Sequence, residues 1–377
     1  MQLQLFSRQS GALCLDGTPA GYYYSTNPNQ DPQRFVIYFE GGGWCYDMAD
    51  CANRALHYDI GSSQNWTATM TPQSVVSGDA KTNPQFSSFT RIWVPYCDGY
   101  SFMGYREQPV AFGSQLVYFR GATVLKELLV TLDAKFRLTA ARDVLVSGCS
   151  AGGLSAILHV DRIRAFVPAA RRVASVPDSG FFLNATNVGG AFEYGAQMAS
   201  GWRLHNATGG ANLRCVAARG DTADCAMAPY VLPHVRAPVF LLNSIYDQWQ
   251  MGNVVGDGVP QASSFQSKCV DHGPRQCNAT ELAVANAFRT QLTADALGGL
   301  KKTDGFALES CWTHCQMWSD FVWSTYAING HLVRDVVAKW WAQLNGGGVP
   351  SVQWRLLDCN ITTVGQQSCN NMCPVWN

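Results

Sequence analysis

The stretch that decides the fold is Asp143-Val144-Leu145-Val146-Ser147-Gly148-Cys149-Ser150-Ala151-Gly152-Gly153. Its first half is a short apolar run, which predicts a buried strand, and its second half is a glycine-rich tight turn. Residues 154–167 then follow a helical pattern. Gly148-x-Ser150-x-Gly152 fits the G-x-S-x-G elbow, in which a nucleophilic serine occupies a strained strand-to-helix turn between small neighbours. The alternative is an ordinary glycine-rich turn between a strand and a helix.

Other segments on either side of this stretch extend the same pattern. Short apolar runs predict strands at 35–39 and 91–96 before it and at 172–176 and 238–243 after it, and helical patterns cover 123–138 and 332–344. Strands that alternate with helices predict an α/β fold with a mostly parallel sheet and helices on both faces. Residues 181–235 are rich in Gly, Asn and Ala and are predicted to form a cap insertion. No long polar linker divides the chain, so we expect one domain over residues 1–377.

The composition excludes several classes of function. The 377 residues include 27 basic and 27 acidic side chains, so the formal net charge is zero and only 14% of residues are charged. Such a chain lacks the excess of positive charge that binding to nucleic acid or anionic lipid requires. A hydrophobic share of 47% and an aromatic share of 12% supply a large core and exclude intrinsic disorder. No apolar run approaches the roughly 18 to 20 residues of a membrane span.

The 14 cysteines favour disulfides and an oxidising compartment. Close pairs such as Cys45 with Cys51, Cys215 with Cys225 and Cys269 with Cys277 can each close a small loop. Zinc is the competing interpretation, for the cysteines and histidine of 311–315 and for Cys369 with Cys373, but no CxxC pair exists.

Five Asn-x-Ser/Thr sequons also support secretion, and they begin at Asn65, Asn184, Asn206, Asn278 and Asn360. The opening residues show no intact signal peptide. If the protein is secreted, the targeting segment has been removed or was never included.

A serine nucleophile needs an acid and a base, which follow it in the order Asp or Glu, then His. Asp247 lies just past the apolar run at 238–243 and is the leading acid, and Asp178 is its rival at the end of another strand. His314 is the leading base because its flanking cysteines could pin the loop. His272, in a solvent-facing loop by composition, and His331, in a turn or at a helix start, are the other histidines late enough in the chain.

The negative oxygen of a tetrahedral intermediate needs backbone donors from two places. Ala151, which follows the serine, supplies one, and the loop Glu40-Gly41-Gly42-Gly43-Trp44 stands where the other is expected. Without Cβ atoms the loop can approach a ligand closely. No Gly-Lys-Ser/Thr follows, which excludes a phosphate-binding loop; a simple turn is the remaining alternative.

Short motifs are spread over nearly the whole chain: Cys14-Leu15-Asp16-Gly17-Thr18-Pro19-Ala20-Gly21-Tyr22, Glu40-Gly41-Gly42-Gly43-Trp44-Cys45, Tyr96-Cys97-Asp98-Gly99, Phe119-Arg120-Gly121, Ser147-Gly148-Cys149-Ser150-Ala151-Gly152-Gly153, Asp178-Ser179-Gly180-Phe181-Phe182, Tyr246-Asp247-Gln248-Trp249-Gln250 and Cys311-Trp312-Thr313-His314-Cys315-Gln316. In this combination the chain resembles the pectin acetylesterase family, whose best-known animal relative is the lipid-removing carboxylesterase Notum. Its loops resemble those of plant members more than those of Notum.

The resemblance implies an α/β-hydrolase fold with Ser150, Asp247 and His314 as the triad. It also implies an oxyanion hole formed by the backbones of Gly42, Gly43 and Ala151.

The resemblance further implies two disulfides, Cys14–Cys97 and Cys45–Cys51. Val160 stands where plant members usually place a cysteine, so the state of Cys149, disulfide or free thiol, stays open. The pairing of the tail cysteines stays open as well.

These features predict a secreted serine carboxylesterase that removes O-acetyl groups from a polysaccharide, pectin above all, through an acyl-enzyme. We expect a monomer that needs no metal or organic cofactor. The alternative is a Notum-like deacylase that removes a fatty acyl group from a lipidated protein, which requires a deep apolar pocket. The aromatic side chains could line such a pocket or stack on sugar rings. Peptide cleavage and a non-catalytic binding module are further interpretations.

Overall fold

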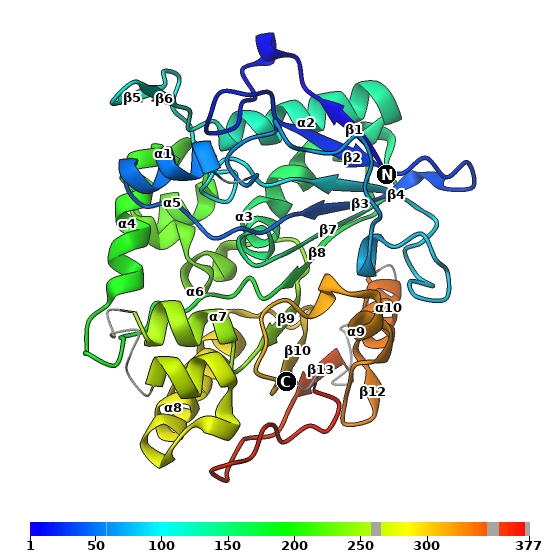
Figure 1. The fold of residues 1–377 in the computed structure, drawn as a ribbon. Coiled ribbons are helices and arrows are strands. Elements are labelled where there is room, and N and C mark those ends of the chain that lie inside the picture. The colour runs from blue at the N-terminus through cyan, green and yellow to red at the C-terminus, as the bar shows by residue number, and fades with distance from the viewer. Residues whose placement is uncertain (58, 258–264, 345–353, 374–377) are drawn as a thin grey trace.

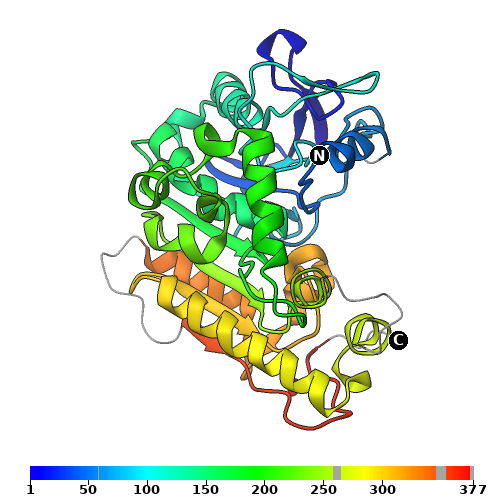
Figure 2. The same cartoon turned by 90° about the vertical axis from the view of Figure 1, so that its left-hand side faces the viewer.

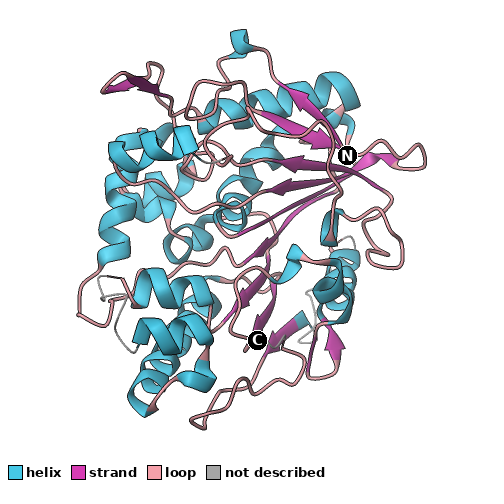
Figure 3. Cartoon of the chain, viewed as in Figure 1, coloured by secondary structure: helices cyan, strands magenta, loops and turns pink. Residues whose placement is uncertain are grey.

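The fold is built on one nine-stranded sheet (Figures 1 and 3). The computed structural model describes residues 1–57, 59–257, 265–344 and 354–373. In spatial order the strands are β1 (Gln2–Leu5), β2 (Gly21–Tyr24), β4 (Phe89–Val94), β3 (Asp31–Phe39), β7 (Asp143–Cys149), β8 (Arg172–Asp178), β9 (Phe240–Ser244), β10 (Gly305–Glu309) and β13 (Arg355–Leu357).

The pairing confirms a mostly parallel sheet. Every neighbouring pair from β4 to β13 is parallel, whereas β1 with β2 and β2 with β4 are antiparallel. The carboxyl ends of the central strands lie in register, because Cys149 pairs with Asp178 and Ser244 pairs with Glu309. The residues that follow these strands therefore meet at one edge of the sheet, where α/β proteins place their ligand and catalytic groups.

Side chains alternate along each strand, and the sheet is covered on both faces. In β3, Phe35, Ile37 and Phe39 face one buried cluster, while Val36 and Tyr38 face another. Long helices cover the first face, namely α2 (Gly121–Phe136), α3 (Ala151–Phe166) and α8 (Ala279–Gly299). The second face is covered by α9 (Asp320–Thr325) and α10 (Val333–Gln343). This arrangement confirms the predicted α/β architecture with helices on both faces.

The span predicted to be a cap contains helices between β8 and β9. They are α4 (Glu193–His205), α5 (Leu213–Arg219) and α6 (Ala228–Val231). Figure 2 views the molecule from the side on which α4 lies. The other short elements are α1 (Met48–His57), α7 (Gln248–Gln250), and two hairpins, β5 (Val110–Phe112) with β6 (Gln115–Val117) and β11 (Ala327–Ile328) with β12 (His331–Leu332). A cap function for this insertion stays a prediction.

All 14 cysteines are paired in seven disulfides. The structure contains the four disulfides for which the sequence suggested both partners: Cys14–Cys97, Cys45–Cys51, Cys215–Cys225 and Cys269–Cys277. The open assignments resolve as Cys149–Cys315, Cys311–Cys373 and Cys359–Cys369. The cysteines considered for zinc are therefore disulfides and offer no thiolate. Among the described residues, no helix is long and apolar enough to cross a membrane.

Candidate active site

Ser150 lies on a sharp turn between β7 and α3. Its backbone has φ 61° and ψ −128°, a positive φ that a residue with a Cβ adopts only when its surroundings impose it. The turn is packed too tightly for side chains at its glycines: a Cβ on Gly41 would lie 2.7 Å from the Cβ of Ser150, and one on Gly148 or Gly152 would collide with backbone oxygens. Helix α3 begins at Ala151, three residues earlier than predicted. Its N-terminus therefore starts directly behind the serine and favours negative charge there.

Asp247 and His314 form a buried pair at the same edge of the sheet. Asp247 follows β9 and caps α7 by accepting the N–H of Gln250 at 3.0 Å. Its carboxylate oxygens lie 3.0 and 2.9 Å from Nδ1 of His314. Asp247 is fully buried, and the His314 side chain is 18% exposed. A carboxylate at Nδ1 fixes the proton on that nitrogen and leaves Nε2 as the basic atom.

The other ring nitrogen of His314, Nε2, points away from this ion pair. Nε2 of His314 is buried and receives no hydrogen bond from the part of the chain that the structure describes. Burial of the ring opposes its protonation, but the charge of Asp247, its hydrogen bond and the charge of Asp178 together raise the pKa of His314. The imidazole is thus a base strengthened by a buried carboxylate.

The alternative acid and the alternative histidines lie outside this pair. The carboxylate of Asp178 accepts the backbone N–H groups of Gln316 and Met317, at 3.0 and 2.5 Å, rather than a histidine nitrogen. Burial raises the pKa of Asp178 to about 6, against the effect of those two hydrogen bonds. His272 and His331 are both exposed, and His331 lies on β12. The structure therefore brings together Asp247 and His314, and it places Asp178 behind the histidine loop.

The glycine-rich loop after β3 presents free backbone donors. The N–H groups of Gly42, Gly43 and Ala151 donate no hydrogen bond within the described chain. The carbonyl of Gly42 accepts from the guanidinium of Arg54, and the carbonyl of Gly43 accepts from the hydroxyl of Tyr96 at 2.8 Å. C=O and N–H point in opposite directions across a planar trans peptide. Fixing the carbonyl of Gly42 therefore also fixes the direction of the N–H of Gly43. Gly43 has φ +63°, which favours glycine.

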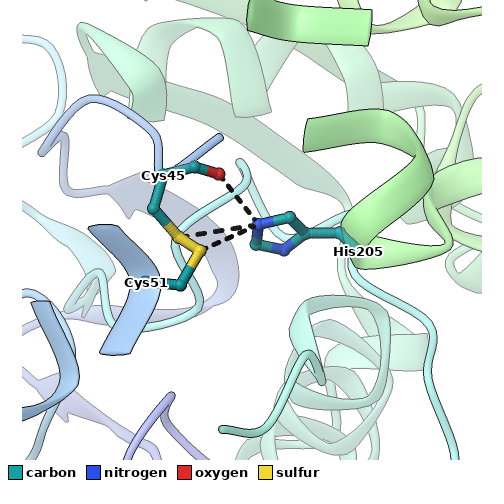
Figure 4. Close-up of side chains that lie close together, drawn as sticks. All are labelled: Cys45, Cys51 and His205. Carbon is teal, nitrogen blue, oxygen red and sulfur yellow. Dashed lines mark hydrogen bonds between the residues drawn. A yellow bond between two sulfur atoms is a disulfide. The ribbon is translucent and has the colours of Figure 1, made fainter. Parts of the chain in front are cut away.

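A disulfide ties this loop to α1, the helix that carries Arg54. Cys45 directly follows Trp44 and pairs with Cys51 of α1, and the ring of His205 packs against both sulfurs, at 3.6 and 3.8 Å (Figure 4). Burial lowers the pKa of His205 to about 3, so the ring is neutral and its Nε2–H donates to the carbonyl of Cys45 at 3.1 Å. These three side chains therefore fix the glycine-rich loop against α1 and α4. Because the sulfurs are bonded to each other, the cluster is not a thiolate metal site.

Ser101 joins the two halves of the proposed oxyanion hole, and sequence reasoning missed it. Its Oγ accepts the indole N–H of Trp44 at 2.8 Å and donates to the carbonyl of Ala151 at 2.9 Å. Its own N–H donates to the hydroxyl of Tyr96, which holds Gly43. Ser101 has φ 49° and is fully buried. No local motif marks such a residue, because two of its partners, Trp44 and Ala151, are 57 and 50 positions away in the sequence.

Aromatic rings surround the imidazole. Trp249 stacks on His314 with ring centroids 6.1 Å apart, and Phe182 lies 6.0 Å from the same ring. Trp44 meets Phe182 and Trp249 edge to face, at 4.8 and 5.7 Å, and Tyr194 of α4 packs against all three. Phe182 and Tyr194 are completely buried. Mutually packed rings therefore line one side of the His314 imidazole.

A polar pocket opens next to these rings. It has a volume of about 360 Å³, and its lining consists of Gly42, Gly43, Trp44, Tyr46, Arg54, Gln197, Trp249, Asn253 and Asp257. The pocket therefore combines the free N–H groups of the glycine loop with an indole, amides and charged groups, which suits a ligand rich in hydroxyl groups.

The sheet topology, the strained serine and the acid–histidine pair define an α/β-hydrolase. A family model for pectinacetylesterase matches residues 1–371, and the chain belongs to that family. Pectin acetylesterase 7 of Arabidopsis thaliana is 32% identical over 97% of this chain and 90% of its own length, and pectin acetylesterase 5 of the same plant is 30% identical over 99% and 85%. The solved structure of the Wnt deacylase Notum from Drosophila superposes with a TM-score of 0.82 at 22% identity, covering 99% of both chains. The protein is thus a carboxylic ester hydrolase.

Proposed function

We propose that this protein is a secreted serine esterase that removes O-acetyl groups from a polysaccharide, with pectin as the leading substrate. The observation that carries the proposal is the convergence of three features at one sheet edge: a serine with positive φ, a histidine paired to a buried carboxylate, and free backbone N–H groups. The names of the plant relatives support acetyl groups of pectin as the target.

The proposed chemistry needs no group beyond the chain and water. Nε2 of His314 takes the proton of Ser150 while Oγ attacks the acetyl carbonyl, and Asp247 stabilises the imidazolium. The N–H groups of Gly42, Gly43 and Ala151 stabilise the negative oxygen, and one such donor contributes about 2.7 to 4 kcal/mol. The imidazolium then protonates the departing sugar hydroxyl. Water, activated by the same histidine, releases acetate from the acyl-enzyme.

The aromatic cluster supports a short acyl group over a fatty one. A fatty chain needs a deep apolar channel, whereas Phe182 and Trp249 beside His314 pack against each other and against Trp44 and Tyr194. The polar pocket next to them favours a sugar over a lipid. The fold shared with Notum keeps the lipid deacylase as the second candidate.

Secretion is supported by the cysteines and by the sequons. Seven disulfides fit an oxidising compartment. Four of the five sequon asparagines, at Asn65, Asn206, Asn278 and Asn360, are exposed and thus accessible to glycosylation. A monomer is the form that we propose.

The deciding experiment compares wild type, Ser150→Ala and Ser10→Ala, a control serine in the N-terminal segment. We expect Ser150→Ala to abolish acetate release from acetylated pectin and labelling by a fluorophosphonate, while Ser10→Ala keeps both. Near-normal acetate release by Ser150→Ala would overturn the serine mechanism. A series of p-nitrophenyl esters separates the two candidates: rates should fall steeply beyond butyryl, and a rise toward octanoyl would favour the lipid deacylase.

A further inference from the structure

One disulfide brackets the two residues that the proposed mechanism must align. Cys149 immediately precedes Ser150, and Cys315 immediately follows His314. The two cysteines are 166 positions apart in sequence, and their disulfide holds their Cα atoms 5.6 Å apart. The candidate nucleophile and base are therefore each one residue from the same covalent cross-link.

A second set of contacts runs through the end of β8. The carbonyl of Asp178 accepts the N–H of Ser150 at 2.9 Å, and its carboxylate holds the backbone just after His314 through Gln316 and Met317. The next residue, Ser179, accepts the N–H of Cys315 on its Oγ at 2.8 Å. Both Asp178 and Ser179 are fully buried. Two neighbouring residues thus contact the nucleophile turn on one side and the histidine loop on the other.

These contacts hold backbone conformations that are unfavourable for residues other than glycine. Ser150, Ser179 and Cys315 have φ values of 61°, 48° and 70°, a region that non-glycine residues rarely adopt. Residues 310–315, which carry His314, form neither helix nor strand. The pair with Asp247 fixes the ring orientation, but it does not fix how far the ring lies from Ser150.

We infer that the Cys149–Cys315 disulfide, with Asp178 and Ser179, forms a positioning frame that sets the separation between Oγ of Ser150 and Nε2 of His314. The inference rests on the proposed function of that pair. Misplacing a reacting group by about 1 Å typically costs about 100-fold in rate. Loss of the cross-link should therefore lower kcat about 10- to 100-fold. It should leave KM within about threefold, because the polar pocket proposed to hold the substrate is lined by other segments.

The test compares the double variant Cys149→Ser/Cys315→Ser with Cys215→Ser/Cys225→Ser, which removes a disulfide between α5 and the short turn that follows it. Both are assayed with p-nitrophenyl acetate, well below the melting temperature of either, since a cross-link between distant residues stabilises more than one that closes a short loop. We expect the loss of kcat only in the first variant. Its acid limb in the pH profile of kcat/KM should persist, because Asp247 still contacts His314. A folded first variant with kcat within about twofold of wild type would overturn the inference, and so would an equal loss in the control.

Ser179→Ala tests the frame with the disulfide intact. It removes the acceptor for the N–H of Cys315, and we expect kcat to fall about 3- to 10-fold at unchanged KM. If the double variant does not fold, this variant decides: unchanged kcat refutes the frame. Ser150→Ala separates the two proposals. Activity retained there defeats the serine mechanism, whereas an inactive Ser150→Ala beside a fully active disulfide variant defeats the frame alone.

Discussion

The hydroxyl of Ser101 donates to the carbonyl of Ala151 while it accepts the indole N–H of Trp44. One buried side chain thus couples the first turn of α3 to the glycine-rich loop after β3. The two halves of the proposed oxyanion hole come from these two segments, so their spacing depends on this residue.

We predict that Ser101→Ala lowers kcat about 10-fold with p-nitrophenyl acetate and leaves the indole N–H of Trp44 buried without a partner. An unsatisfied buried donor costs about 1 to 3 kcal/mol of stability. Ser155→Ala is the matched control, because Oγ of Ser155 donates to the same carbonyl of Ala151 at 2.7 Å without reaching the loop. Equal losses of kcat in the two variants would refute a special role for Ser101.

The acyl-size preference should depend on Tyr194. Its ring packs against Trp44, Phe182 and Trp249, and its hydroxyl has no partner among the described residues. Tyr194→Ala should open space within this aromatic cluster and raise the octanoyl-to-acetyl ratio of kcat/KM about 10-fold or more. Tyr194→Phe keeps the ring and should retain the wild-type ratio. If both variants leave the ratio unchanged, the aromatic cluster does not limit the acyl group.

The pH dependence of the reaction should follow the protonation of His314. A base acts only when unprotonated, and the pKa of His314 is raised above its ordinary value of 6.5 because Asp247 and Asp178 outweigh the effect of burial. We therefore expect kcat/KM to decrease as pH falls, with a midpoint above 6.5. Asp247→Asn removes the main stabilising charge, so it should move this midpoint down and lower kcat about 10³- to 10⁴-fold. A profile that stays flat down to pH 4 would exclude His314 as the base.

Much of the fold could be predicted because its signals are local. The apolar run 143–147 and the glycines around Ser150 specify a strand and a tight turn within a few residues, and chain order then selected Asp247 and His314. Two missed elements also carried local signals. Gln2–Leu5 alternates polar and apolar residues as an edge strand does, and Asn278 with Glu281 forms the capping box that starts α8.

The remaining features depend on contacts between distant segments. The pairing of Cys149 with Cys315 and the link from Ser101 to Trp44 arise only when β3, β7, β8, β9 and β10 have assembled into one sheet. Positive φ at Ser101 and Cys315 leaves no trace in the sequence, because neither residue is a glycine. Positioning groups of this kind become visible only in three dimensions.

A buried acid at the end of β10 should make the stability of the fold depend on pH. Oε2 of Glu309 accepts the N–H of Cys311 at 2.8 Å and the hydroxyl of Tyr326 at 3.2 Å. Burial, with a smaller contribution from the charge of Asp358, raises the pKa of Glu309 from 4.5 to about 8. Between pH 4.5 and about 8, Glu309 therefore stays protonated in the folded chain, whereas it has lost its proton in the unfolded chain. The free energy of unfolding should therefore decrease as pH rises from about 4.5 to about 8, and this contribution levels off above that.

Glu309→Gln removes the ionisation and keeps an amide that can still accept both hydrogen bonds. Its stability relative to wild type should therefore increase steadily with pH across this window, as measured by urea denaturation at pH 5, 6.5 and 8. Glu107→Gln removes the same charge from an exposed loop and should run parallel to wild type. If the Glu309→Gln curve also runs parallel to wild type, Glu309 ionises in the folded protein as readily as in the unfolded chain, and its burial does not control the pH dependence of stability.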